Sequence, residues 1–179
     1  MSKNKKLIIF TDSGDTLIDE ATQVRDERGI VLRADFIPGA GEMLKTLHDE
    51  GFIIALVADG EWESFQNVYR ENGMGYCFDA WIVSEVVGVQ KPAPIMFETA
   101  MEKLGLTDAD RSRIVMIGNN LKKDVAGANR QGLISVWLDW SPRYFHTIEE
   151  PDWQPDYTVS TPAQMLELLH QLEDKLNDK

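Results

Sequence analysis

Four polar segments hold residues that could act on an anionic group, and each follows an apolar run: Asp12, Ala58-Asp59, Lys91-Pro92 and 119–124. Mg²⁺ prefers one or two carboxylates together with water and substrate oxygens, so Asp12 and Asp124 are suited to hold it. The ammonium group of Lys91 would offset the charge of a phosphoryl group. An aspartate beside Mg²⁺ can attack phosphorus and form an aspartyl-phosphate, which water then cleaves. The pattern therefore favours phosphoryl chemistry.

The elements that would position these residues alternate in type along the chain. Continuous apolar runs predict buried parallel strands at 7–10, 52–57, 81–83, 114–117 and 134–138. Apolar residues at helical spacing predict helices at 39–50, 62–72, 95–104, 121–131 and 162–179, the first four of which end at or just before a glycine.

This alternation predicts an α/β fold with a Rossmann-like, doubly wound parallel sheet in a single domain over residues 1–179. Ligands of such sheets bind at the carboxyl ends of the strands, so the four polar segments are expected to converge there. Two stretches depart from the alternation. Residues 19–36 are expected to form a loop or hairpin, and 140–157, which contain three prolines, an irregular surface loop.

Composition excludes several classes of function. The formal charge of −12 and a pI near 4.6 repel nucleic acid and anionic membranes. The single cysteine, Cys77, cannot form an intramolecular disulfide and is interpreted as a packing residue. The apolar run at 7–10 is too short for a signal peptide, and no run approaches the length of a membrane span. A cytoplasmic protein is therefore expected.

Four motifs resemble those of the haloacid dehalogenase superfamily, and they occur in that family's order between residues 7 and 133. They read LIIFTDSGDTL (7–17), GFIIALVADG (51–60), VGVQKPAPIMFETAMEKLGL (87–106) and IVMIGNNLKKDVAGANRQGL (114–133). Each is weak alone, but together they are a strong signal.

The resemblance implies a Mg²⁺-dependent hydrolase and assigns roles residue by residue. Asp12 matches the nucleophile that also binds the metal, and Lys91 matches the lysine that contacts the phosphoryl group. Asp124 matches a metal carboxylate, and Asn119 replaces a second acidic residue with an amide able to hold a metal-bound water. The backbone carbonyl of Gly14 can also reach the metal.

Besides Asn119, the chain departs from the family pattern at four positions. Gly14 replaces the aspartate that protonates the leaving group, and Asp15 occupies a slot usually held by glycine, where a mostly structural role is expected. Ala58 replaces a serine or threonine that grips the phosphoryl oxygen. Asp59 replaces an asparagine and is predicted to contact substrate. General acid catalysis is typically worth about 10²–10⁴-fold, so a slow enzyme is expected.

The gaps between motifs leave room for a hairpin but not for a full cap domain. By resemblance, capless members act on large substrates or borrow a lid. A lid is expected from residues 140–157, which contain Arg143, Tyr144 and His146, from residues 19–36, or from a second subunit.

Three functions stay open at the level of sequence. The leading hypothesis is a phosphomonoester hydrolase acting through Asp12. The second is a catalytically silent domain that binds a phosphorylated ligand or a protein partner, motivated by Gly14 and Ala58. The third and weakest is dehalogenation, which also uses an aspartate nucleophile but needs no metal and normally a substantial cap.

Overall fold

The computed structural model describes residues 7–178 and contains one parallel six-stranded sheet. Its order is β5-β4-β1-β6-β7-β8, and every pairing is parallel. The strands span Ile8–Thr11 (β1), Ile53–Ala58 (β4), Ala80–Val83 (β5), Ile114–Gly118 (β6), Ile134–Leu138 (β7) and Tyr157–Val159 (β8). The predicted α/β class is confirmed. Residues 1–6 and residue 179, the last of the predicted helix 162–179, lie outside the described residues.

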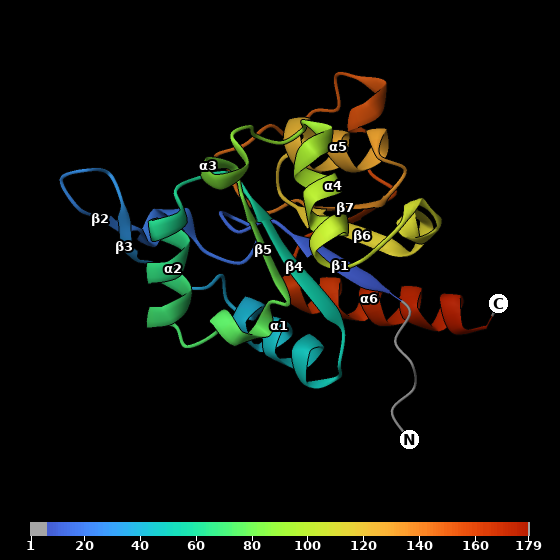
Figure 1. Ribbon diagram of the computed structural model, residues 1–179, viewed down its shortest axis with the longest axis horizontal. Coiled ribbons are helices and arrows are strands. Elements are labelled where there is room, and N and C mark those ends of the chain that lie inside the picture. Colours follow the sequence, from blue (N-terminus) through green and yellow to red (C-terminus); the bar gives the residue numbers. More distant parts are fainter. Residues whose placement is uncertain (1–6, 179) are drawn as a thin grey trace.

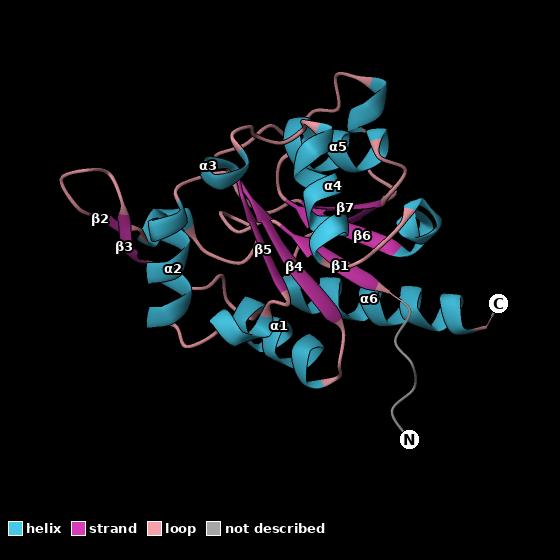
Figure 2. Ribbon diagram, viewed as in Figure 1, coloured by secondary structure: helices cyan, strands magenta, loops and turns pink. Residues whose placement is uncertain are grey.

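Helices cover both faces of the sheet, as Figures 1 and 2 show. One face carries α1 (Ala40–Asp49) and α6 (Pro162–Asn177), and the other carries α4 (Pro94–Lys103) and α5 (Ala126–Arg130). Alternate residues of β1 enter the two cores: Ile9 packs with the α1 and α6 side, and Ile8 and Phe10 with the α4 side. The continuous apolar strands predicted from sequence are the consequence of this two-sided burial.

Two elements were missed by the sequence prediction. The strand β8 pairs with β7 at the edge of the sheet, and Tyr157 had been assigned to the end of an irregular loop. The single-turn helix α3 (Ser84–Val87) follows β5 directly. Both are three or four residues long, too short to show a period in the sequence, and tertiary contacts define them.

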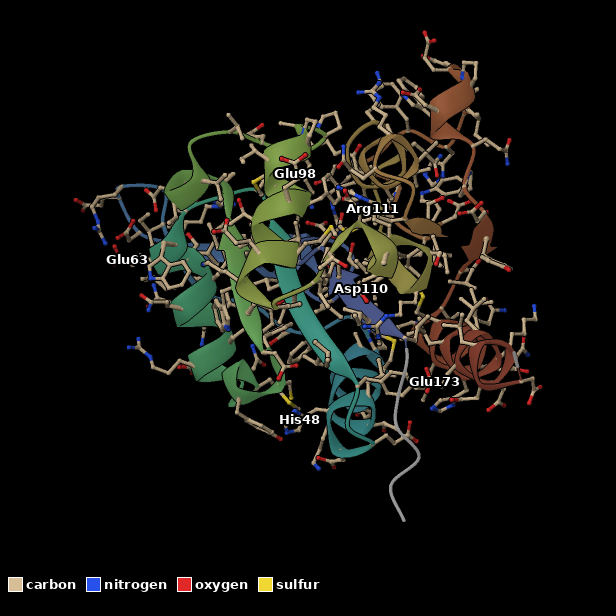
Figure 3. All side chains as sticks on the ribbon, turned by 45° about the vertical axis from the view of Figure 1, so that its right-hand side comes forward. His48, Glu63, Glu98, Asp110, Arg111 and Glu173 are labelled. Atoms are coloured by element: carbon tan, nitrogen blue, oxygen red, sulfur yellow. The ribbon has the colours of Figure 1, made fainter. Side chains whose placement is uncertain are left out.

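The chain between β1 and β4 forms a small hairpin instead of a cap domain. Strands β2 (Val24–Arg25) and β3 (Val31–Arg33) pair antiparallel and extend beyond the edge of the sheet in Figure 1. The hairpin rests on α2 (Trp62–Glu71), where Ser64 Oγ accepts a hydrogen bond from the Val31 amide at 3.0 Å. At its tip Arg28 Nη2 lies 2.8 Å from an oxygen of Glu63, labelled on α2 in Figure 3.

Residues 140–157 are irregular, as predicted, apart from a short 3₁₀ turn at Pro151–Trp153 and Tyr157, the first residue of β8. Asn129 of α5 fixes this loop by donating hydrogen bonds to the carbonyl oxygens of Asp152 (2.7 Å) and Gln154 (2.8 Å). Within residues 7–178, no helix combines the length and the apolar character needed to cross a bilayer.

Candidate active site

The ammonium group of Lys91 is the centre of a buried ion cluster at the carboxyl end of β1. Its Nζ atom lies 2.8 Å from Asp12 Oδ1 and 2.7 Å from Asp124 Oδ1, and it donates to the carbonyl oxygen of Val57 at 2.7 Å. The side chains of Lys91 and Asp124 are 1% exposed, whereas Asp12 is 14% exposed. Asp12 is therefore the more exposed of the two carboxylates in the cluster.

The charges in this cluster shift two pKa values upward. Burial lowers the pKa of Lys91, but the negative charges of Asp12, Asp124 and Asp59 raise it by more, so the ammonium group stays charged. Burial and the charge of Asp12 raise the pKa of Asp124, and Lys91 opposes that shift. Two carboxylates next to one lysine thus leave an excess of negative charge, which a bound cation would neutralise.

A helical turn of unusual width places Asp124. The predicted helix 121–131 begins as a π-helix at Leu121–Val125 and becomes the α-helix α5 only at Ala126. Asn120 caps this turn by accepting from the Lys122 and Lys123 amides, and its own amide donates to Asp124 Oδ2 at 3.0 Å. Single π-turns occur frequently at functional sites, and the 3.6-residue period in the sequence did not reveal this one.

Gly118, the last residue of β6, lies against the Asp124 carboxylate. A Cβ atom at Gly118 would lie 2.2 Å from Asp124 Oδ2, which no real contact tolerates. The absence of a side chain at residue 118 is therefore what lets Asp124 fold back to Lys91.

Replacing Gly118 with alanine is expected to displace Asp124 and weaken binding of a divalent cation by about 10–100-fold, the range seen when groups that orient metal ligands are lost. Isothermal titration with Mg²⁺ measures this. Gly75→Ala is the matched control, because a Cβ there would make an ordinary 3.5 Å contact with Trp81. Equal Mg²⁺ affinity in Gly118→Ala and the native protein would contradict this account of Asp124.

Asn119 and Thr16 complete the polar wall beside Asp12. Thr16 Oγ1 lies 3.3 Å from Asp12 Oδ2 and 3.4 Å from Asn119 Oδ1, both long hydrogen bonds. Among the described residues, the buried Asn119 Nδ2 has no hydrogen-bond partner. Buried polar atoms are normally paired, so Nδ2 points to a ligand oxygen or water at this position. Sequence reasoning did not single out Thr16, although it belongs to the first motif.

Asp59 reaches the same pocket, but protein donors occupy both of its carboxylate oxygens. Oδ1 accepts from the Lys91 amide at 3.0 Å, and Oδ2 accepts from Lys123 Nζ at 2.9 Å. Asp59 thus positions the backbone of Lys91 and brings a second lysine to the pocket. Its contact with substrate stays a prediction. Sequence reasoning missed Lys123, which directly precedes Asp124.

Asp15 is held by protein groups away from the pocket. Its φ of +50° lies in the left-handed region, which explains why glycine suits this position. Aspartate tolerates this region better than most other residues. Arg143 Nε donates to Asp15 Oδ2 at 2.7 Å, and Ser141 Oγ donates to the same oxygen at 2.5 Å. Burial raises the pKa of Asp15, but hydrogen bonds from Arg143, Ser141 and the Glu20 amide outweigh it and lower the net value.

Arg143→Met is expected to destabilise the fold by about 2 kcal/mol near neutral pH. This is less than the 3–5 kcal/mol of a fully buried pair, because the Arg143 side chain is 36% exposed and water screens its charge. In the native protein the lowered pKa of Asp15 contributes stability above its unfolded value of about 3.9, and this contribution is lost as the pH falls through the lower folded value. Arg143 makes the largest single contribution to lowering this pKa, so the variant has less of this stability to lose in acid.

The difference in unfolding free energy between native protein and Arg143→Met should therefore shrink as the pH is lowered from about 5, through the unfolded pKa of Asp15 at about 3.9, toward its lower folded value. Urea unfolding at each pH measures it. The control is Arg130→Met, which breaks a surface pair with Asp152 and should cost less than about 1 kcal/mol at every pH. A difference that grows toward acid would contradict the assignment to Asp15.

The pocket above Asp12 is a small polar cavity of about 110 Å³, which we call the Asp12 pocket. Its wall includes Asp12, Gly14, Lys91, Asn119 and Asp124, the residues that the sequence predicted to converge. It also includes Glu20, Asn120, Lys123 and Tyr144. Within residues 7–178, no set of three or more His, Cys, Asp or Glu side chains is arranged to hold a metal.

The comparisons with known proteins identify the family. The haloacid dehalogenase-like hydrolase profile matches residues 4–132. The chain therefore belongs to the haloacid dehalogenase-like hydrolase family, as predicted. The small hairpin between β1 and β4 fits the predicted capless or minimal-cap type.

Two curated relatives share this region. The chain is 33% identical over 142 residues to the pyrimidine 5′-nucleotidase YjjG of Escherichia coli K12, covering 78% of this chain and 56% of the relative. It is 30% identical over 139 residues to a glyceraldehyde 3-phosphate phosphatase of Methanopyrus kandleri, covering 72% and 54%. The chain thus spans about half the length of these relatives.

The fold also matches solved structures over most of its length. An uncharacterized protein from Listeria monocytogenes serotype 4b superposes with a TM-score of 0.76 at 22% identity, covering 94% of this chain and 99% of that chain. At this identity the likeness establishes the fold alone.

Proposed function

We propose that this protein is a Mg²⁺-dependent phosphatase that hydrolyses a phosphomonoester through an aspartyl-phosphate on Asp12. The observation that carries the proposal is the position of Lys91, whose ammonium group lies within 2.8 Å of both Asp12 and Asp124. The names of the two curated relatives, a pyrimidine 5′-nucleotidase and a glyceraldehyde 3-phosphate phosphatase, support the same reaction class.

The donor set of the pocket fits Mg²⁺. Asp12 and Asp124 would supply carboxylate oxygens, Gly14 a backbone carbonyl and Asn119 an amide partner for a bound water. Mg²⁺ keeps several waters and binds through one or two carboxylates, which agrees with a pocket that offers two. When bound, Mg²⁺ would neutralise charge on the transferring phosphoryl group and on the carboxylates.

The residues of the chain divide the remaining work. A carboxylate oxygen of Asp12 attacks phosphorus, and Thr16 and Lys91 hold that carboxylate in place through contacts at 3.3 Å and 2.8 Å. The charged amine of Lys91, which Val57 and Asp124 fix in position, stabilises the negative charge of the phosphoryl oxygens. Lys123 adds a second positive charge at the pocket wall. Water then attacks the aspartyl-phosphate and restores Asp12.

The proposed ligand is a phosphorylated molecule and not a nucleic acid, since the net charge of −12 disfavours polyanions. We also propose that the protein works in the cytoplasm, as its single cysteine suggests. We also propose that a second subunit supplies a lid over the site.

The test is release of inorganic phosphate from a panel that includes aryl, sugar and nucleoside monophosphates. Activity should require Mg²⁺, disappear with a chelator and return when Mg²⁺ is restored. A native protein that releases no more phosphate than Asp12→Asn from any substrate would overturn the proposal and leave the catalytically silent domain as the better hypothesis. Chloride release from a haloacid that persists with chelator would instead establish a dehalogenase.

A further inference from the structure

Gly14 has no side chain, and the carboxyl group of another residue fills the space that its side chain would take. A Cβ atom at Gly14 would lie 2.0 Å from Glu20 Oε1 and 2.9 Å from Glu20 Cδ. The φ angle of Gly14 is not positive, so its backbone would accept a side chain if Glu20 moved away. Glu20 thus stands where the resemblance expects the carboxyl group of residue 14.

Glu20 also lies at the boundary between two cavities. It lines the Asp12 pocket and a neighbouring cavity of about 230 Å³ between the hairpin and α2, which we call the hairpin pocket. The two share Gly14, Glu20 and Asp59. If phosphorus is attacked in the Asp12 pocket, the hairpin pocket is the adjoining space for the rest of the substrate. The oxygen that joins the two parts would then lie near Glu20.

Contacts from two segments, the turn at Asp15 and the loop that carries Arg143 and Tyr144, hold Glu20 in this place. Tyr144 donates its hydroxyl hydrogen to the carboxylate, at 3.1 Å from Oε1 and 3.0 Å from Oε2. The Glu20 amide donates to Asp15 Oδ1 at 3.0 Å. Arg143, next to Tyr144 in sequence, is bound to Asp15 and so fixes the loop that carries Tyr144.

Charged groups from several elements surround Glu20. Burial and the negative charges of Asp15 and Asp12 raise the pKa of Glu20, while the Tyr144 hydrogen bond and Arg143 lower it by less. The walls of the two pockets bring further charged groups near it: Asp59, Lys91, Lys123 and Asp124 in the Asp12 pocket, and Arg25 and Glu61 in the hairpin pocket.

We propose that Glu20 supplies the acid that residue 14 lacks, an inference that rests on the proposed phosphatase function. As an Asp12 oxygen bonds to phosphorus, the bond between phosphorus and the substrate oxygen breaks, and that oxygen keeps the electron pair and takes the proton of Glu20. In the second step water bonds to phosphorus and gives a proton to the Glu20 carboxylate. The bond from phosphorus to Asp12 breaks, and the electron pair returns to the Asp12 carboxylate.

The test compares Glu20→Gln with the native protein on two substrates in single-turnover kinetics. With an alkyl monophosphate, whose leaving oxygen needs a proton, formation of the alcohol should slow by about 10²-fold or more. With 4-nitrophenyl phosphate, whose leaving group departs unprotonated, the first release of 4-nitrophenol should change by less than about threefold. Glu27→Gln, exposed on the same hairpin, should match the native protein on both substrates.

A second variant moves the carboxyl group back to residue 14. Gly14→Asp combined with Glu20→Ala removes the 2.0 Å overlap and should recover most of the alkyl phosphatase activity that Glu20→Ala alone loses. Thermal melting and Mg²⁺ titration of each variant separate a loss of fold or metal from a loss of acid.

The outcomes distinguish this inference from the proposed function. A native protein without phosphatase activity overturns both. An active native protein whose Glu20→Gln variant is unchanged, or is slowed equally on both substrates, overturns the role of Glu20 alone. Slowing confined to the alkyl substrate, together with recovery in the double variant, supports it.

Discussion

Asp12→Asn is expected to reduce phosphate release by at least about 10⁴-fold, because an amide is too poor a nucleophile to replace the carboxylate that forms the covalent intermediate. The loss should appear in kcat on every substrate, whatever its leaving group. The fold should persist, since Lys91 keeps its contacts with Asp124 and with the Val57 carbonyl. Phosphate release and thermal melting of the same samples measure the two effects.

Asp174→Asn is the matched control for this change, since Asp174 is exposed on α6, away from the pocket. Its activity should equal that of the native protein. A residual activity in Asp12→Asn within about tenfold of the native value would show that Asp12 is not the nucleophile.

Lys91→Met is expected to affect both activity and stability. Methionine keeps most of the length of lysine but removes the charge that holds Asp12 and Asp124 together. Loss of one preorganised electrostatic contact typically lowers kcat by about 10²–10³-fold. Leaving buried carboxylates without their partner should cost about 3–5 kcal/mol in unfolding free energy. Phosphate release and urea unfolding measure these changes.

Mg²⁺ should restore part of the stability of Lys91→Met, because a divalent cation can neutralise the same carboxylates. Lys45→Met is the control, since Lys45 pairs with Asp49 on the exposed side of α1 and should cost less than about 1 kcal/mol. A Lys91→Met protein that is as stable as the native one, with or without Mg²⁺, would contradict the buried ion cluster.

The parts of the site that the sequence predicted are those that directly follow strands or lie in a family motif. Asp12 follows β1, and Asn119 follows β6, so parallel pairing alone brings them to one edge. Lys91 and Asp124 could be assigned to the site only from the spacing of the family motifs. Each lies in a turn, and the hydrophobic period of the sequence does not reveal the direction of a turn. The hydrogen bonds of the π-turn at Leu121–Val125 span one residue more than those of an α-helix, a difference that apolar spacing over five residues cannot resolve.

Glu20 could not be placed from sequence, although its neighbours could. It lies in the insert between β1 and β4, where no motif fixes the path of the chain. Its position depends on Tyr144, more than a hundred residues later, and on the missing side chain of Gly14. The position of Arg143 also depends on long-range contacts. Arg143 pairs with Asp15 because the φ of +50° turns Asp15 away from the pocket. The sequence offered one indirect indication of such a residue. Because Gly14 has no acidic side chain, either another residue supplies the proton or none does.

The central claim, covalent catalysis by Asp12, is tested most directly by mass spectrometry of the peptide that contains Asp12 after acid quench of a turnover mixture with Mg²⁺ and a good aryl phosphate substrate. The account predicts the added mass of one phosphoryl group on Asp12, lost on treatment with hydroxylamine and absent without Mg²⁺. For turnover in ¹⁸O-water, it predicts that the label enters phosphate and not Asp12. Label in the Asp12 carboxylate, or a phosphoryl group on another residue, would contradict it.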